Sequence, residues 1–191
     1  GATYTVVVTG LASYAISKRG LPGRRGLSIF MLIPMYISGG LIPTYILMFR
    51  LQLINSFWVY ILPNGFWAFN MLLMRTYFDG LPRELEEAAK LDGAGEWQIF
   101  WRICLPQCRA ALYSIAILVF IDYWNMVEQP LILLPDASQQ PLSVYLSQIN
   151  AGEIGIAFAA AVVYMIPGLL LFLHGEAYLV EGIAYSGSVK G

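Results

Sequence analysis

The stretch 27–49 reads LSIFMLIPMYISGGLIPTYILMF and contains no Asp, Glu, Lys or Arg. The stretch 57–74, FWVYILPNGFWAFNMLLM, contains none either. A helix needs about 20 mostly apolar residues to cross the hydrocarbon core of a bilayer, which is about 30 Å thick. Both stretches are continuously apolar and lack the period-two alternation of a membrane β-barrel strand. They therefore predict an all-α protein that spans a membrane.

The composition of the whole chain agrees with this class. Hydrophobic residues make up 58 % of the 191 residues and charged residues 12 %, whereas soluble domains have about 45–50 % and about 25 %. Further apolar runs lie at 2–16, 109–134 and 154–180. We expect a single domain over 1–191 with about five transmembrane helices. Because the first run is short and no charged leader precedes it, we also expect an N-terminally truncated chain, the C-terminal part of a longer protein.

Lysine and arginine fall almost entirely at one set of the expected helix ends. Cytoplasmic loops of membrane proteins carry an excess of these residues. This rule makes the turn 18–25, the segment 79–109 and the C-terminal tail cytoplasmic, and it turns the loops 50–56 and 132–153 outward. Arg50 lies on the outer side; the other ten of the 11 cations lie on the cytoplasmic side, and they are Lys18, Arg19, Arg24, Arg25, Arg75, Arg83, Lys90, Arg102, Arg109 and Lys190.

The segment 79–109 is unusually rich in charge and predicts two short helices. Pro82 suits the start of the first helix and Gly93 its end. Glu86 and Lys90 are spaced as a favourable i,i+4 ion pair. A narrow face of mostly small residues would let another surface approach closely, and it consists of Leu85, Ala88, Ala89 and Asp92.

The second helical stretch is expected over 96–104, before Leu105-Pro106 closes it. It carries the aromatic residues Trp97, Phe100 and Trp101. Helices this short are marginal on their own in water. The segment therefore needs a partner.

The spacing within this segment resembles a known motif. Membrane subunits of binding-protein-dependent ABC importers carry a cytoplasmic loop of the form EAA, three residues, Gly, nine residues and I-x-L-P. The chain matches both spacings with EAA at 87–89, Gly93 and ICLP at 103–106. In that family the loop forms a coupling helix that sits in a groove of a separate ATPase. The resemblance implies a coupling role for Glu87, Ala88, Ala89, Gly93, Ile103, Leu105 and Pro106.

Further motifs are similar to the carbohydrate-uptake permeases of the maltose and multiple-sugar type. They are LIPTY at 41–45, WN at 124–125, PL at 130–131 and SVKG at 188–191. The resemblance covers nearly the whole chain and implies the family's six-helix core, here without its first span. One departure is HGE at 174–176, where the family often has Gln-Arg or Gln-Lys before an aromatic residue.

The same resemblance implies partners and a location. The partners are a second permease subunit, two copies of an ABC ATPase, an extracytoplasmic solute-binding protein and the lipid bilayer. The location is the cytoplasmic membrane of a bacterium or archaeon, in a multi-pass arrangement with a cytoplasmic C-terminus. No nucleic-acid partner is expected.

The sequence argues against an enzyme. None of the three lysines precedes Ser or Thr, so the phosphate-binding motif GxxxxGK[ST] is absent. ATP would therefore be bound by the partner ATPase, and no cofactor is expected in this chain. The single pair Cys104 and Cys108 lacks the companions of a metal site and is expected to be two free thiols. His174, the one histidine, is expected near the cytoplasmic end of the last span beside Glu176, and no Ser-His-Asp or Cys-His constellation is visible.

Asp122 lies about halfway along the run 109–134 and marks a candidate solute pathway. A carboxylate at mid-bilayer costs about 2.5–3.5 kcal/mol on the insertion scale, so it should face the bundle interior or a wet cavity. Aromatic faces beside hydrogen-bonding groups suit a sugar. The alternatives are that these side chains only pack, or that Asp122 pairs with the second permease. The candidate residues are Asp122, Tyr123, Trp124, Asn125, Asn64 and Asn70.

Three functions remain open from the sequence. The first is a permease subunit that carries a sugar or oligosaccharide and is driven through the coupling loop. The second is an ABC permease for another solute, such as a peptide or an amino acid. The third is a membrane scaffold protein without a transport role.

Overall fold

The computed structural model describes residues 1–37, 39–149 and 154–188, which form helices and connecting turns without a strand. In chain order the elements are α1 (Ala2–Ser17), α2 (Arg24–Tyr36), α3 (Leu41–Arg50), η1 (Phe57–Tyr60), α4 (Ala68–Asp79), α5 (Arg83–Leu91), α6 (Glu96–Ile99), η2 (Phe100–Cys104), α7 (Leu105–Gln107), α8 (Arg109–Trp124), α9 (Glu128–Leu133), η3 (Ala137–Gln139), α10 (Leu142–Ser147) and α11 (Ile154–Ser188). The tail residues 189–191, which include Lys190, lie outside the described part.

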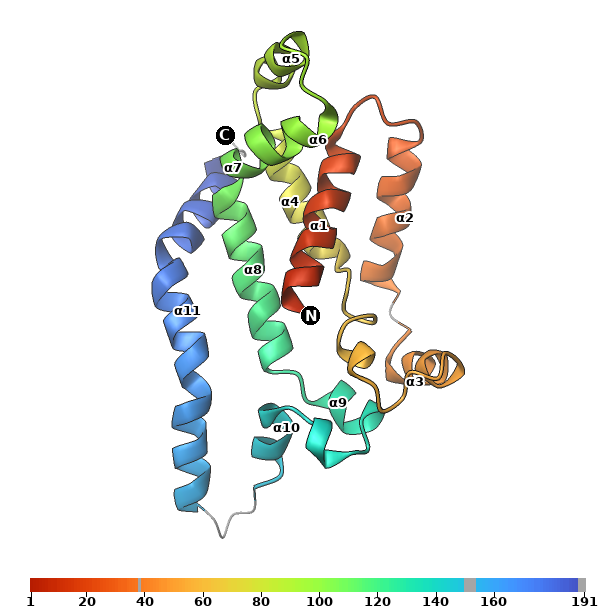
Figure 1. The fold of residues 1–191 in the computed structure, drawn as a ribbon, viewed down its shortest axis with the longest axis vertical. Helices are drawn as coiled ribbons and strands as arrows, with labels where there is room; N and C mark the ends of the chain where they lie inside the picture. Colours follow the sequence, from red (N-terminus) through yellow and green to blue (C-terminus); the bar gives the residue numbers. More distant parts are fainter. Residues whose placement is uncertain (38, 150–153, 189–191) are drawn as a thin grey trace.

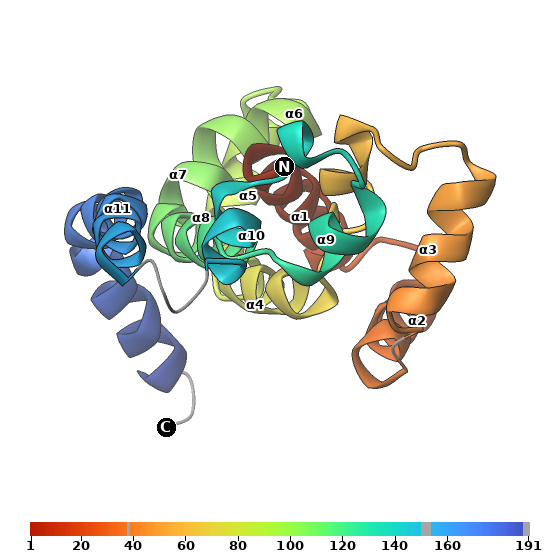
Figure 2. The same cartoon turned by 90° about the horizontal axis from the view of Figure 1, so that it is seen from below.

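The helices form a bundle around α1. Helix α1 packs against α4 and α8, α2 packs beside α4, and α11 runs along α8. Elements α5, α6 and α7 lie at one end of the bundle, and α3, α9 and α10 lie at the other (Figure 1). Seen along the bundle, α2 and α3 lie on one side of the centre, and α11 lies on the opposite side (Figure 2).

The face that α1 turns to its neighbours is polar. Thr5, Thr9 and Ser13 are spaced four residues apart, so they share one helix face, and each is at most 1 % exposed. The Ser13 hydroxyl donates to the Met71 carbonyl of α4 at 2.9 Å. Small polar side chains of this kind allow helices in a membrane to approach closely.

The spans are shorter and more broken than the sequence predicted. The segment Gly155–Glu176 of α11 is long and apolar enough to cross a bilayer alone. Two bent pairs meet the same test only when each pair is taken together: α2 with α3 at 111°, and Glu96–Gln107 with α8 at 81°. Helix α1 is apolar but shorter. Within the described residues, length and composition thus support one to three spans, and the expected number of about five stays a prediction.

The expected helix over 27–49 is wrong as a single element. It divides at Gly40, whose φ of 77° and ψ of −171° lie in a region that only glycine adopts readily. The helix expected over 57–74 is wrong in its first half, because regular α-helix begins only at Ala68. Pro63 lacks a backbone donor, and Gly65 closes a turn on the Leu62 carbonyl at 3.4 Å.

The expected helix over 109–134 also ends early. Helix α8 stops at Trp124, and the chain resumes helical structure in α9. Asn125 supports this end, because both its backbone N–H and its side-chain amide donate to the Ile121 carbonyl, at 2.9 and 3.0 Å. A local side-chain bond of this kind competes with continued helix.

Gly175 explains the departure noted at 174–176. It is buried on α11, and a Cβ atom there would lie 2.2 Å from Ile117 Cδ1 on α8. The absent side chain therefore allows α11 to approach α8. Nearby, Tyr113 and Tyr178 stack across the same helix pair with centroids 4.5 Å apart.

Replacing Gly175 with leucine should weaken the α8–α11 contact. Overpacking a close contact costs about 1–3 kcal/mol, which lowers the melting temperature of a chain this size by roughly 3–10 °C. Thermal unfolding in detergent measures the effect. Gly168→Leu on the same helix is the matched control, because nothing lies within 4 Å of a Cβ atom there. Equal melting temperatures for the two variants would contradict the proposed close approach.

Candidate coupling surface and solute pocket

Helix α5 forms where the sequence predicted it, directly after Pro82 and up to Leu91. Its C-terminus is closed by Gly93, which adopts a φ of 82°. The Gly93 N–H donates to the Lys90 carbonyl at 3.0 Å, and the Ala94 N–H donates to the Ala89 carbonyl at 2.9 Å. This is the Schellman pattern, which requires the left-handed conformation that glycine adopts without strain. Nothing crowds Gly93, so the turn is the reason for the glycine.

The two alanines of the EAA motif differ in exposure. Ala89 is 8 % exposed and belongs to the buried core, together with Ile99, Phe100 and Cys104. Ala88 and Glu87 are exposed. The face that the sequence grouped together is therefore divided between the inside of the chain and its surface. The small size of Ala89 allows close packing inside the chain. The small side chain of Ala88 leaves the backbone of α5 accessible on its outer surface.

The second stretch is helical beyond the predicted end. The chain is helical from Glu96 to Gln107, so it passes through Leu105-Pro106 instead of closing there. The turn before Pro106 is a π turn in which the Leu105 N–H donates to the Phe100 carbonyl. This wider turn shifts the hydrogen-bond ladder where proline lacks a donor. Ile103 and Leu105 are half-buried, and Pro106 is exposed.

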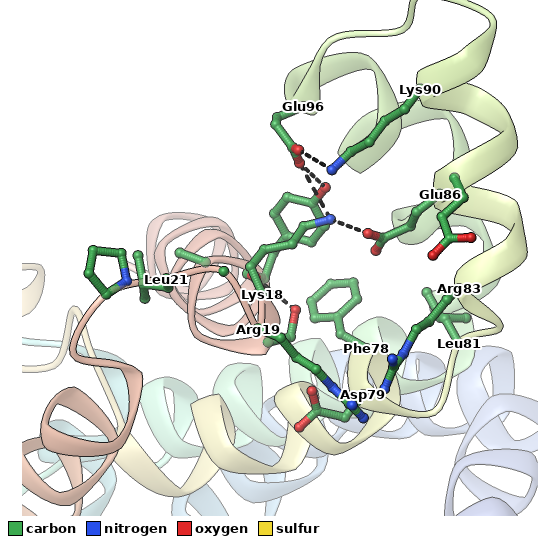
Figure 3. A pocket seen from close by; sticks show the side chains of 16 residues that line it. Lys18, Arg19, Leu21, Phe78, Asp79, Leu81, Arg83, Glu86, Lys90 and Glu96 are labelled. Atoms are coloured by element: carbon green, nitrogen blue, oxygen red, sulfur yellow. Dashed lines mark hydrogen bonds and ion pairs between the residues drawn. The ribbon is translucent and has the colours of Figure 1, made fainter.

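A cavity of about 680 Å³ separates α5 from the end of α1, and charged residues line it (Figure 3). The predicted pair of Glu86 with Lys90 is wrong. Glu86 instead binds Lys18, with Oε2 2.5 Å from Nζ, and Lys90 binds Glu96, with Nζ 2.7 Å from Oε1. The hydrogen bond from Lys90 lowers the pKa of the Glu96 carboxyl.

Both cysteines are buried free thiols, as the sequence predicted. Cys104 Sγ lies 3.5 Å from Glu86 Oε1 and donates its proton there. Burial, and next the Glu86 carboxylate, raise the pKa of Cys104 to about 12. This thiol is therefore protonated and unreactive at neutral pH.

A second pocket, of about 260 Å³, brings together half of the candidate pathway residues. Asn64, Asp122 and Tyr123 all line it. The Asn64 side-chain amide donates to Gln129 Oε1 at 2.6 Å, and its backbone carbonyl accepts from the Tyr123 hydroxyl at 3.2 Å. The other residues that line the pocket are Trp67, Val119, Met126, Val127, Glu128 and Gln129.

The remaining candidates lie elsewhere. The Trp124 indole stacks on Tyr164 of α11 and donates to the Tyr164 carbonyl at 3.2 Å. Asn125 Oδ1 accepts from the Tyr164 hydroxyl at 2.9 Å. Asn70 is buried on α4 and is not among the residues that line the pocket. Trp124 and Asn125 therefore contact Tyr164 of α11, away from the pocket of Asn64.

Sequence reasoning missed Trp67 and Gln129, which line the pocket, and Lys18, which binds Glu86 of α5. Trp67 lies in the run that was expected to be regular helix, and Gln129 lies in one that was expected to be a span. Lys18 was counted only for its charge. Pro63 and Gly65 before Trp67, and Pro130 beside Gln129, were the available signals of interrupted helix.

Comparisons with known proteins agree with this architecture. A polygalacturonan/rhamnogalacturonan transport system permease protein of Bacillus subtilis, YtcP, is 33 % identical over all of this chain and 73 % of its own length. A trehalose/maltose transport system permease protein of Thermococcus litoralis, MalG, is 33 % identical over 98 % of this chain and 70 % of its own.

A solved structure and a family model point the same way. A chain from the crystal structure of a bacterial ABC transporter involved in the import of the acidic polysaccharide alginate superposes with a TM-score of 0.82 at 29 % identity, covering 93 % of this chain and 71 % of that one. The family model of the binding-protein-dependent transport system inner membrane component matches residues 7–178. This chain belongs to that family of inner membrane transport components.

Proposed function

We propose that this chain is a permease subunit of an ABC importer for a sugar or oligosaccharide, driven by separate ATPase subunits through α5. The observation that carries the proposal is the exposed helix α5, which places the EAA motif at one end of a membrane bundle. The relatives named above transport carbohydrates according to their names, which favours this solute class. Membership of a binding-protein-dependent family supports a solute-binding protein and a second permease as further partners.

The charge distribution supports a cytoplasmic α5. Lys18 and Arg24 lie at the ends of α1 and α2 that face α5, and Arg109 opens α8 at the same end of the bundle. Arg50 closes α3 at the opposite end (Figure 1). Positive residues mark the cytoplasmic side. In this orientation the C-terminal part of α11 also faces the cytoplasm.

The outer surface of α5 suits a docking partner. Ala88 and Asp92 are exposed, and the large apolar side chains Leu85 and Leu91 are 40 % and 88 % exposed. A small residue flanked by exposed leucines gives a shallow apolar patch on a helix that projects from the bundle (Figure 1). A helix of this kind, laid into a groove, is a recurrent mode of protein recognition.

A charge placed at Ala88 tests the docking role. Ala88→Glu should leave the chain folded, because the side chain is exposed, but an unpaired charge in the interface should lower ATPase association by at least about tenfold. Co-purification of the ATPase subunits and solute uptake measure this effect. Ala137→Glu, also exposed but at the opposite end of the bundle, is the control. If association and uptake stay normal with Ala88→Glu, the outer surface of α5 is not the docking surface for the ATPase.

The pocket of Asn64 and Asp122 fits a carbohydrate. Trp67 is 42 % exposed and offers an aromatic face for the C–H face of a sugar. Asn64 and Gln129 supply amide donors and acceptors for hydroxyl groups. Few polar groups on a largely apolar lining are typical of sites that orient a small molecule.

The charges in this pocket favour a neutral sugar. Asp122 and Glu128 both line it, and none of the described lining residues is a Lys, Arg or His. Like charges placed side by side cost several kcal/mol. A uronate carboxylate would therefore be repelled unless another subunit neutralised it.

Removing one carboxylate tests both the pocket and its preference. We expect the complete transporter to take up maltotriose in preference to digalacturonate, and Asp122→Asn to raise uptake of the acidic sugar relative to the neutral one by at least about fivefold. Trp67→Ala should lower uptake of both. Asp136→Asn, an exposed carboxylate at the outer end, is the control for charge alone. If Asp122→Asn and Trp67→Ala leave the uptake of both sugars unchanged, these residues pack within the protein and do not contact the solute.

A further inference from the structure

The projecting helix α5 has few attachments to the bundle. Ala89 is its one buried residue. A helix of nine residues is marginal on its own, so its position depends on the bonds that its side chains make to other elements. Among the ion pairs of the described residues, the one that joins α5 to a helix of the bundle is that between Glu86 and Lys18.

Lys18 lies at the centre of this attachment. It follows the last residue of α1, and its ammonium group binds Glu86 of α5 and lies 3.4 Å from Glu96 Oε2 of α6. The same ammonium lies 4.2 Å from the centroid of the Tyr14 ring, and the Tyr14 hydroxyl donates to Glu96 Oε2 at 3.2 Å. Figure 3 shows the side chains of Lys18, Glu86 and Glu96 converging at the cavity.

The junction is partly shielded from water. The side chains of Lys18 and Glu86 are 22 % and 27 % exposed, whereas those of Lys90 and Glu96 are 51 % and 58 % exposed. Partial burial reduces screening, so the Lys18–Glu86 pair interacts more strongly than an exposed pair. This pair therefore links α5 to the end of α1.

The other end of α1 touches the solute pocket. The Thr5 hydroxyl lies 3.0 Å from the Asn64 carbonyl and 3.0 Å from the Tyr123 hydroxyl, and Thr5 is fully buried. Asn64 and Tyr123 both line the pocket. Thirteen positions separate Thr5 from Lys18, which is about 20 Å along a helix. One rigid element thus contacts the coupling helix at one end and the pocket at the other.

We propose that α1 transmits the movement of α5 to the pocket, with Lys18 and Thr5 as the positioning residues at its two ends. The proposal rests on the proposed function, since it concerns how ATPase docking reaches the solute. Rigid elements joined by hydrogen bonds and ion pairs can carry such coupling, but a pathway needs direct coupling measurements.

The test uses the complete transporter reconstituted in liposomes, with solute uptake measured per ATP hydrolysed. Lys18→Met should lower this ratio by at least about fivefold, the lower end of coupling between sites. The ATPase subunits should still associate, because the outer face of α5 is unchanged. Lys18→Arg keeps the charge and should restore most of the ratio. Arg25→Met removes an exposed cation from the same turn and should leave the ratio unchanged.

Two further variants separate transmission from folding. Glu86→Gln should lower the ratio, and the double variant with Lys18→Met should lose no more than Lys18→Met alone, because residues acting through one contact are not additive. Thr5→Val keeps the shape of the side chain but removes its hydroxyl, and it should also lower the ratio while association persists.

The outcomes that overturn the proposal are distinct from failure of the proposed function. A normal ratio in Lys18→Met, or additive losses in the double variant, would remove α1 as the transmitting element. If the unaltered chain neither binds ATPase subunits nor supports uptake, the transporter assignment itself fails.

Discussion

The architecture depends on the rule that backbone hydrogen-bonding groups in a membrane must find partners within the protein. Regular helix satisfies it, so every break needs side chains to replace the lost bonds. At the break before α4, the Asn64 carbonyl receives the hydroxyls of Thr5 and Tyr123. At the end of α8, Asn125 donates to the Ile121 carbonyl. Asn64 and Tyr123, which meet at the first break, also line the pocket beside it, so the break and the pocket share these two residues.

This rule also explains how much could be predicted from sequence. Uncharged runs and the excess of cations on one side indicated an all-α membrane protein, and Pro82 and Gly93 indicated the bounds of α5. Local signals of this kind depend on composition and backbone preference. The breaks at 61–67 and 125–127 were missed because the apolar pattern continues through them. Gly65 and Asn125 act there through local bonds to the Leu62 and Ile121 carbonyls, but an isolated Gly or Asn in an apolar run does not by itself exclude helix.

The partners of charged residues were harder still to predict. Spacing alone favoured Glu86 with Lys90, because i,i+4 neighbours share a helix face. An exposed pair of this type contributes only a few tenths of a kcal/mol. A partly buried partner such as Lys18, brought in from α1, outcompetes it. Tertiary contacts also decide the two alanines of the EAA motif. Ala88 and Ala89 are the same residue type, and Ala89 is the one that faces inward because Phe100 and Cys104 lie on its side of the helix.

The contact between α1 and α4 is suited to movement. Along most of this face the side chains are small and polar: the Ser13 hydroxyl donates to the Met71 carbonyl of α4, and the Thr5 hydroxyl donates to the Asn64 carbonyl just before α4. Thr9 Oγ1 is buried and has no hydrogen-bond partner among the described residues. An unpaired buried hydroxyl costs about 1–3 kcal/mol. A displacement of α1 that gave Thr9 a hydrogen-bond partner would recover that free energy. The Thr9 hydroxyl therefore does not oppose sliding of α1 along α4. At the α5 end, by contrast, Tyr14 packs edge-on against Phe78 in the apolar core. The contact between α1 and α4 therefore combines small polar side chains along most of α1 with an aromatic contact at the end nearer α5.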